Sequence, residues 1–519
     1  MHDRTSNIGT ARLLAPPLSW APGDRTGIWP GVAFIALSIV IAELSLFLHP
    51  AGFAGGPSDD QQYLDIALGW YAHGPQIGTS HWALRHPLIL SITGMFQLFG
   101  PSIDSLLLVP RAFYALFVGV TMATVLRLAG MRAAMVWLVL VILSPVLHAM
   151  GTSCYPEMLE LAFSATSIWA FLNARRSTGG VSLGWSLLSG LLLGCAVMTR
   201  ETAAFMLLFY GWAFLRDPVM PRRNYLLLGL GFALPLLIDN AWLWAMTGDP
   251  LYRLHVDEHH VLIASDHMVG KTYAGSPFLN PDLASRWIPA GPTQLHWAVN
   301  PLGDFLIDPA FGFVILGWAL SALPFFRDRA IAPPKIATLW LLLFAVASYV
   351  MVTWVFTLRP QPRYYLFVAA AATIGFALYI DSALAIPRLR RRASILLGLV
   401  LLGGGITIAV APDQGWQAKL VVPYMAAHPG QYSAEDHIVG RASYPLARLG
   451  MADKLTTAKP AVGEYRFRQI SSAVFDGTAP FPHDPSYQEI AYLDRPSPWL
   501  LLLIRPHFRT AILVERRMR

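Results

Sequence analysis

An adjacent pair of carboxylates, Asp59 and Asp60, is the strongest local signal for chemistry in the sequence. The pair opens a stretch, residues 59–72, whose apolar residues recur at helical spacing. At a helix N-terminus the two carboxylates could serve only as caps, because they face the positive end of the helix dipole. The functional interpretation makes one of them a general base that removes a proton from an acceptor alcohol or amine. Asp59 and Asp60 are therefore our candidate catalytic residues.

Other charged and aromatic residues fall near the ends of apolar segments, on what we expect to be the same side of a membrane. A lone arginine in such a place most often extends to the lipid headgroups. Several arginines that converge instead favour a phosphate or pyrophosphate site, because a guanidinium offers planar, paired donors. The candidate substrate-binding residues are Tyr63, Arg85, His86, Arg111, Glu157, Arg200, Glu201, Arg363 and Tyr364.

The elements that must position these residues are membrane-spanning helices. Of the 519 residues, 55% are hydrophobic and 13% are charged, whereas a soluble protein would carry roughly 25% charged residues. The charges cluster between apolar runs of about 20 residues, the length that crosses a bilayer. We therefore predict an α-helical polytopic membrane protein with about eleven transmembrane helices. The runs lie at residues 28–48, 104–129, 133–150, 155–174, 181–198, 202–215, 225–246, 309–326, 336–357, 364–382 and 393–411.

The distribution of basic residues predicts the orientation of these helices. The net charge of +7 does not indicate nucleic-acid binding, because the excess consists of arginines at the ends of the apolar runs. Clusters of Arg and Lys occur in the leader, residues 1–27, and in every second connection after it. Since such clusters remain in the cytoplasm, we predict a cytoplasmic leader, a transmembrane domain over residues 28–411 and an outer C-terminus. Two long loops, 49–103 and 247–308, and the tail 412–519 then lie outside, so we expect the functional site there.

Two segments on the outer side have structure of their own. Residues 86–100 are apolar but too short to span a bilayer comfortably, so we predict an interfacial or re-entrant helix in the first outer loop. The tail 412–519 is richer in charged residues, Pro and Gly, and its stretches Val462–Ile470 and Trp499–Leu513 are typical of strands. We predict a small outer domain of mixed α/β type, and the alternative is an ill-packed extension.

A competing motif lies in the second outer loop. His255-Val256-Asp257-Glu258-His259 fits H-x-x-E-H, a zinc-peptidase pattern. Such a site needs a third ligand from another helix and further residues that orient the ligands. The nearby sequence offers no clear third ligand, and a pattern of five residues arises readily by chance. We therefore prefer an outer-loop helix whose polar face contributes to the acceptor or headgroup environment.

The order of these features resembles that of a known superfamily. The motifs, in chain order, are Asp59-Asp60-x-x-Tyr63, the basic-x-Pro-Leu helix from Arg85 to Gly100, Arg111, Glu157 beside a proline, and Arg200-Glu201. Over roughly residues 28–380 this order resembles the GT-C glycosyltransferases. The nearest resemblance is to the bacterial branch related to protein O-mannosyltransferases and to the aminoarabinose transferase of lipid A.

The resemblance implies a glycosyltransferase that takes a sugar from a polyprenyl-phosphate-linked donor. The acceptor would be a lipid, glycan or protein at the outer face of a bacterial plasma (inner) membrane, and membrane lipids would surround the enzyme. Asp59 would be the catalytic acid or base, with Asp60 assisting. Arg85 stands where the family has a basic residue that contacts the lipid phosphate, and Glu157 stands where a second functional acid occurs.

One departure from the family concerns metal binding. Relatives often carry Glu just before a basic-Pro-Pro-Leu motif, but here Leu84 holds that place and His86 replaces the first Pro. A divalent metal held jointly by the first acid and that Glu would therefore lack one of its ligands. His81 and His86 could substitute, yet we name no metal ligand, and a divalent metal is the only cofactor that the resemblance suggests.

Two other classes of function stay open. A transporter or flippase would carry ionisable residues near the bilayer midplane, where Glu43, Glu160 and Asp239 fall. Most charges lie instead at the outer boundary, which favours chemistry at the surface. A scaffold whose tail binds a cell-wall partner is the non-enzymatic alternative.

Overall fold

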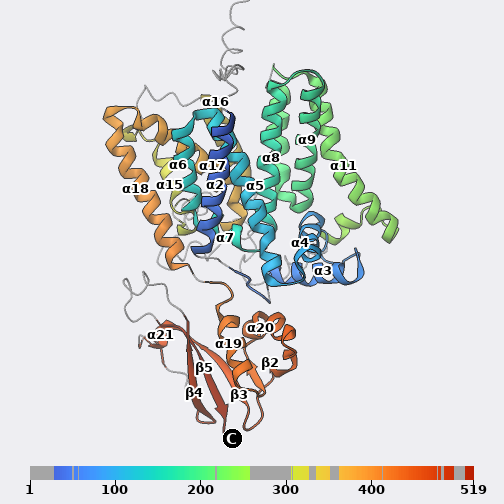
Figure 1. The fold of residues 1–519 in the computed structure, drawn as a ribbon, viewed down its shortest axis with the longest axis vertical. Helices are drawn as coiled ribbons and strands as arrows, with labels where there is room; N and C mark the ends of the chain where they lie inside the picture. The colour runs from blue at the N-terminus through green and yellow to red at the C-terminus, as the bar shows by residue number, and fades with distance from the viewer. Residues whose placement is uncertain are drawn as a thin grey trace, which may run out of the picture.

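The protein consists of a helical bundle and a small domain with a β-sheet beyond one end of the bundle (Figure 1). The computed structural model describes residues 28–48, 52–56, 58–216, 219–257, 306, 308–326, 335–350, 362–411, 413–475, 477, 479–480, 484–495 and 509–519. Each apolar run predicted from the sequence contains a helix within the described residues. The bundle helices are α2 (Ile28–Leu48), α5 (Ile103–Ala129), α6 (Met131–Ile142), α7 (Pro145–Thr152), α8 (Pro156–Arg176), α9 (Gly179–Thr199), α10 (Met206–Arg216), α11 (Arg222–Thr247), α15 (Val314–Leu320), α16 (Lys335–Val350), α17 (Leu366–Leu384) and α18 (Pro387–Val410).

The number of membrane crossings stays a prediction. Within the described ranges, five helices are long and apolar enough to cross a membrane, and α6 and α7 together would form a sixth. These two are bent by 66° where α6 ends before Pro145, because a proline disfavours the helical conformation of the residue before it. The predicted number of about eleven transmembrane helices therefore stays a prediction, and so does the predicted cytoplasmic position of the N-terminus.

Close helix packing explains the interior of the bundle. Helix α17 lies at the centre of the bundle. Of the apolar stretch within Pro362–Leu384, which contains this helix, 83% is buried. Helices α9 and α11 approach so closely that a Cβ at Gly190 would lie 2.0 Å from the carbonyl oxygen of Leu228. Small residues permit such contacts between membrane helices.

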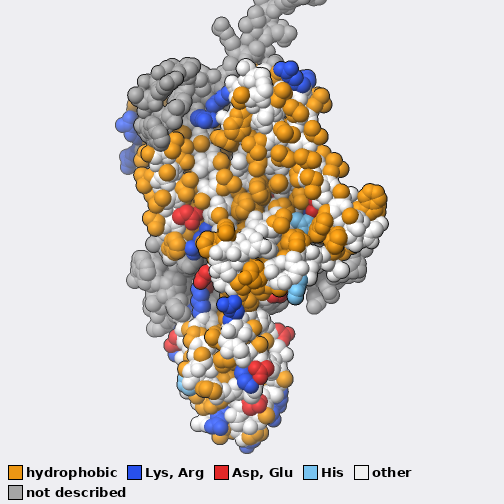
Figure 2. Space-filling model, turned by 45° about the vertical axis from the view of Figure 1, so that its right-hand side comes forward, with side chains coloured by type: hydrophobic (Ala, Val, Ile, Leu, Met, Phe, Trp, Pro, Cys, Tyr) orange, Lys and Arg blue, Asp and Glu red, His pale blue; other side chains and the backbone are white. Residues whose placement is uncertain are grey.

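Charged and hydrophobic side chains occupy different parts of the surface. In Figure 2, hydrophobic side chains cover the sides of the bundle, and Lys and Arg side chains lie at the end away from the sheet domain. Helix α8 ends there with Arg175 and Arg176. The opposite end, next to the sheet domain, carries the acidic pair.

Two short helices lie against this opposite end (Figure 1). They are α3 (Asp59–His73) and α4 (His86–Phe99), which confirms the helical predictions for both segments. Their facing sides form a core that includes Tyr63, Trp70 and Phe96. The core continues onto α5, so the two helices are fixed to the bundle. Asp59 opens the first of these helices and Arg85 directly precedes the second.

The C-terminal domain has the predicted mixed α/β character. It contains α19 (Trp416–Ala427), β1 (Tyr432–Ala434), α20 (Asp436–Arg448), β2 (Leu455–Thr456), β3 (Tyr465–Ile470), α21 (Ser472–Phe475), β4 (Tyr487–Asp494) and β5 (Ala511–Arg517). The strand order is β2-β1-β3-β5-β4, with β1 parallel to both neighbours and the other pairs antiparallel. The predicted strand Val462–Ile470 contains β3. The other, Trp499–Leu513, overlaps β5 at its end, and its residues 499–508 lie outside the described residues.

The C-terminal domain packs directly on the loop that precedes Asp59. The amide of Gly56 donates a hydrogen bond to the carbonyl of Gly440 in α20 (3.2 Å). The two backbones are so close that a Cβ at Gly440 would lie 2.3 Å from the Gly56 carbonyl oxygen. Arg448 adds a bond to the carbonyl of Pro101 (2.9 Å). The domain therefore helps to fix the loop from which the acidic pair emerges.

Candidate active site

Asp59 presents a carboxylate that is paired but still reachable. One oxygen, Oδ1, accepts a hydrogen bond from Trp82 Nε1 (3.1 Å). The other, Oδ2, lies 3.0 Å from Nη2 of Arg363. The side chain keeps 29% of its surface exposed. A carboxylate in this state can accept a proton from a ligand while its neighbours hold it in place.

Asp60 lies in a different environment although it is the next residue. It is fully buried, and its Oδ2 accepts a hydrogen bond from the amide of Ala54 (2.6 Å). Its Oδ1 is bonded to the Ser58 hydroxyl. Burial raises the pKa of the Asp60 carboxyl above its ordinary value, and these hydrogen bonds offset only part of the rise. The bonds hold the turn before α3 and so fix the start of the helix at Asp59.

Glu157 connects two arginines in the interior of the site. It lies in the first turn of α8, where Pro156 starts the helix, and its side chain is 3% exposed. Arg200 donates to its Oε1, and Nε of Arg363 lies 3.5 Å from the same atom. Among the described residues its Oε2 has no hydrogen-bond partner. Since buried polar groups are nearly always bonded, this atom is free for a ligand or water.

Aromatic rings fix the two guanidinium groups. Arg363 lies over the ring of Tyr155 (4.6 Å to its centroid) and Arg200 over the ring of Tyr364 (4.3 Å). Nη2 of Arg363 also donates to the Tyr364 hydroxyl (3.3 Å). Arg200 reaches the site because α9 ends there: its backbone is extended (φ −161°, ψ 131°) between α9 and the 3-10 helix η2 (Glu201–Phe205). Arg363 comes from a second 3-10 helix, η6 (Pro362–Tyr365).

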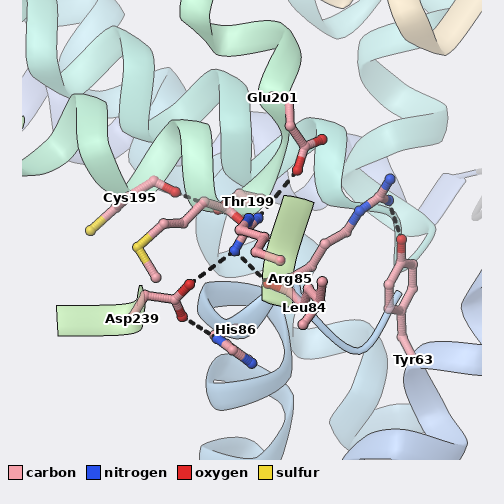
Figure 3. Close-up of polar contacts among 10 residues, drawn as sticks. Tyr63, Leu84, Arg85, His86, Cys195, Thr199, Glu201 and Asp239 are labelled. Carbon is pink, nitrogen blue, oxygen red and sulfur yellow. Dashed lines mark hydrogen bonds and ion pairs between the residues drawn. The ribbon is translucent and has the colours of Figure 1, made fainter. Parts of the chain in front are cut away.

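Arg85 supplies a cation without an ion pair among the described residues. It donates to the hydroxyl of Tyr63, which is fully buried (Figure 3). Burial raises the pKa of the Tyr63 phenol above its ordinary value, so the phenol stays neutral. The Asp59 and Glu157 carboxylates lie within electrostatic range of Arg85 but do not pair with it. Its guanidinium can therefore take an additional anion.

His86, Glu201 and Asp239 form a second polar network (Figure 3). His86 Nδ1 bonds to Oδ1 of Asp239, and both side chains are buried. Arg253 bonds to Oδ2 of Asp239 (3.2 Å) and to Oε1 of Glu201 (3.2 Å). His86 and Glu201 were both expected at the site. They belong instead to this second network, which lies next to the site.

The structure joins most of the predicted residues, places His86 and Glu201 in the neighbouring network and leaves Arg111 apart from both. Arg111 contacts α2, with its guanidinium 4.4 Å from the ring centroid of Phe47, and in the described part of the chain no hydrogen bond or ion pair joins it to Asp59. Sequence reasoning missed the site roles of Trp82, Tyr155 and Arg253. Tyr155 had a signal, because it directly precedes the proline and acid that open α8. For the other two, no local pattern distinguishes them.

The residues at the site do not form a metal-binding set. In the described ranges, no group of three or more His, Cys, Asp or Glu side chains gathers to hold an ion. Both oxygens of Asp59 face nitrogen donors, and Nδ1 of His86 is engaged by Asp239. In the zinc-peptidase pattern, His255 instead bonds to Asp249 (2.7 Å), and residues 258–259 lie outside the described residues.

The chain is similar to known membrane glycosyltransferases. Residues 86–244 match the family model described as dolichyl-phosphate-mannose-protein mannosyltransferase. The crystal structure of ArnT from Cupriavidus metallidurans bound to undecaprenyl phosphate aligns with a TM-score of 0.51 at 14% identity, over 93% of this chain and 98% of that chain. The Archaeoglobus fulgidus oligosaccharyltransferase in its apo form aligns with a TM-score of 0.47 at 14% identity, over 84% of this chain and 65% of that chain. No curated protein sequence matches the chain.

At this level of identity the likeness to ArnT is one of fold. That fold and the apolar helices indicate a multi-pass membrane protein. The family model matches less than half of the chain, so the comparisons show similarity to that family over residues 86–244 and a fold shared with ArnT.

Proposed function

We propose that this protein transfers a sugar from a polyprenyl-phosphate-linked donor to an acceptor hydroxyl or amine at the outer face of a bacterial plasma membrane. The observation that carries the proposal is the partly exposed Asp59 carboxylate beside Arg363, close to the unpaired Arg85 cation. A base and an anion site are the two groups that this reaction needs. Undecaprenyl phosphate, bound in the ArnT crystal structure, is a lipid phosphate of this class.

In the proposed reaction, the acceptor oxygen or nitrogen attacks the anomeric carbon of the sugar. The bond between this carbon and the phosphate oxygen breaks, and its electron pair leaves with the lipid phosphate. Asp59 takes the proton of the acceptor as the new bond forms. Arg85 binds the leaving phosphate and stabilises the charge that develops on it. The neutral Tyr63 phenol accepts a bond from Arg85 and so orients its guanidinium.

The other residues hold these groups in place. Asp60 fixes the turn before Asp59 through Ala54 and Ser58. Glu157 keeps Arg200 and Arg363 together. Two of the three acids considered for a transporter role are already engaged, because Asp239 uses both carboxylate oxygens and Glu160 accepts a bond from Thr202 (2.5 Å).

The orientation in the membrane is part of the proposal. The site lies at the bundle end next to the C-terminal domain, and Arg175 and Arg176 lie at the other end (Figure 1). The positive-inside rule then puts the site outside, towards the periplasm. Labelling of an Ala447→Cys variant, at an exposed position of α20, by a membrane-impermeant reagent in intact spheroplasts would check this orientation.

Mass spectrometry of envelope glycolipids and glycoproteins, with and without the protein, tests the function and identifies the product. We expect Asp59→Asn to lower transfer by about 10²–10⁴-fold, the range typical for loss of a general base. Asp65→Asn is the matched control, because Asp65 is an exposed residue of the same helix that bonds only locally to Gln61. Full activity of the Asp59→Asn protein would refute the assignment.

A further inference from the structure

Arg253 makes four polar contacts, to Leu84, Met198, Glu201 and Asp239. It lies in a helical segment over residues 252–257, at the start of the second long loop, and its side chain is 18% exposed. Two contacts are the ion pairs with Asp239 and Glu201. The other two go to backbone carbonyls: Nη1 donates to Leu84 (3.0 Å) and Nη2 to Met198 (3.1 Å).

The two carbonyls belong to the segments that carry the site arginines. Leu84 directly precedes Arg85, so the contact fixes the peptide from which Arg85 emerges. Met198 lies in the last turn of α9, two residues before Arg200. Carbonyls in the last turn of a helix lack intrahelical partners, so a side-chain donor there replaces a missing bond. One guanidinium therefore links the backbones of both arginines.

The same group of contacts also fixes the residue that follows Arg85 in the chain. Asp239, which binds Arg253, also bonds to His86, the residue that follows Arg85. Both neighbours of Arg85 are thus connected to one buried ionic group. Only arginine can make this set of contacts, because its planar group offers five donors in a fixed geometry and lysine offers a single point charge.

We infer that Arg253 is a positioning residue that sets the placement of Arg85 relative to the Arg200–Glu157 pair. This inference rests on the proposed function for its effect on catalysis, because Arg85 is the proposed contact of the donor phosphate. The claim that Arg253 fixes the backbone beside Arg85 and Arg200 does not depend on that function. The start of the second outer loop, rather than α4 or α9 alone, then determines the geometry of the phosphate site.

The test compares Arg253→Met and Arg253→Lys with the unchanged protein in lipid nanodiscs. Arg222→Met is the matched control, because Arg222 opens α11 and lies over the ring of Phe214 (4.5 Å), which is not a residue of the site. The readouts are the melting temperature, the Kd for undecaprenyl phosphate, and the exchange of backbone amides in residues 84–90 and 198–204. If Arg253→Met fails to fold, Arg253→Lys provides the same readouts.

We expect Arg253→Met to weaken undecaprenyl phosphate binding about tenfold, the loss of roughly one charge-assisted contact. Amide exchange should rise in both segments and stay unchanged in α8. Arg253→Lys should recover the melting temperature but only part of the binding. In an Arg85→Met background, Arg253→Met should change the Kd less than twofold, because the group that it positions is gone.

Three outcomes decide between the possibilities. Unchanged amide exchange in both segments overturns the inference, as does an equal effect on binding in the two backgrounds, which would indicate a purely structural role. If the unchanged protein binds no undecaprenyl phosphate while Arg253→Met still raises exchange in both segments, the positioning stands and the proposed function fails.

Discussion

Two ionic clusters of similar composition lie side by side at one end of the bundle, and they differ in how completely their atoms are bonded. The open cluster contains Asp59, Glu157, Arg200 and Arg363, and the closed cluster contains His86, Glu201, Asp239 and Arg253. Two buried atoms of the open cluster, Oε2 of Glu157 and Nε of Arg363, have no hydrogen-bond partner among the described residues. In the closed cluster, Asp239 uses both oxygens and Arg253 has four partners.

The difference indicates which cluster acts on a ligand. A buried polar atom without a partner costs about 1–3 kcal/mol, and a ligand or water that bonds to it removes that cost. In the open cluster these atoms lie beside a carboxylate that is still reachable, which is the arrangement expected of a binding site before its ligand arrives. The closed cluster has satisfied its groups and serves to hold backbone in place. Residue types alone would not separate the two.

The largest expected effect comes from removing the carboxylate at the centre of the open cluster. Glu157→Gln leaves Arg200 and Arg363 close together without their shared anion. Loss of one partner of a buried ion pair lowers the free energy of unfolding by about 3–5 kcal/mol. Unfolding in detergent micelles would measure this change. Glu435→Gln, an exposed carboxylate of the C-terminal domain, is the control.

A second variant would show that unpaired charge is the cause. Adding Arg200→Gln to Glu157→Gln should recover part of the lost stability, because one uncompensated cation is then removed. A double variant that is less stable than Glu157→Gln alone would contradict the description of this cluster as charge-balanced.

Sequence reasoning identified much of this end of the molecule, for clear physical reasons. The two short helices could be predicted because apolar periodicity and a segment too short to cross the bilayer are local properties. The arginines at helix ends could be predicted because membrane helices rarely tolerate charge elsewhere. The mixed α/β tail was evident from its composition, although the edge strand β4 shows no regular alternation of burial and was missed.

The division of roles within the site could not be predicted, because it depends on contacts distant in sequence. Adjacent residues of a helix point about 100° apart, so one of Asp59 and Asp60 had to be less exposed, but the sequence does not say which. Trp82 reaches Asp59 across 23 positions, and Arg253 reaches Leu84 across 169. Arg111 looked equivalent to the other arginines until the structure placed it against α2.

The next effect concerns the cation between the two clusters. Arg85→Met removes the proposed phosphate contact but breaks no ion pair among the described residues. A hydrogen bond to a charged group contributes about 1.5–3 kcal/mol, so we expect the Kd for undecaprenyl phosphate to rise about 10- to 100-fold. Isothermal calorimetry in nanodiscs would measure it, with Arg391→Met in the basic start of α18 as the control. An unchanged Kd would mean that the phosphate binds elsewhere.

A smaller effect is expected where the C-terminal domain supports the open cluster. Gly440→Ala places a methyl group 2.3 Å from the Gly56 carbonyl oxygen, so α20 and the loop before Asp59 must separate. Such overpacking costs about 1–3 kcal/mol, and we expect transfer to fall by up to about tenfold as Asp59 shifts. Gly398→Ala in α18 is the control, because nothing lies within 4 Å of its added Cβ. Equal activity of the two variants would show that the domain does not position the site.

The smallest effect is expected in the closed cluster, at Glu201. Its side chain is 46% exposed, and an exposed ion pair is worth only about 0–1 kcal/mol because water and salt screen it. Glu201→Gln also keeps an oxygen that can accept the bond from Arg253, whose contacts with Asp239, Leu84 and Met198 remain. The melting temperature and the Kd for undecaprenyl phosphate should therefore stay close to those of the unchanged protein. If Glu201→Gln proved as damaging as Glu157→Gln, the two clusters would not differ in the way that their hydrogen bonds indicate, and Glu201 would have to contact the ligand directly.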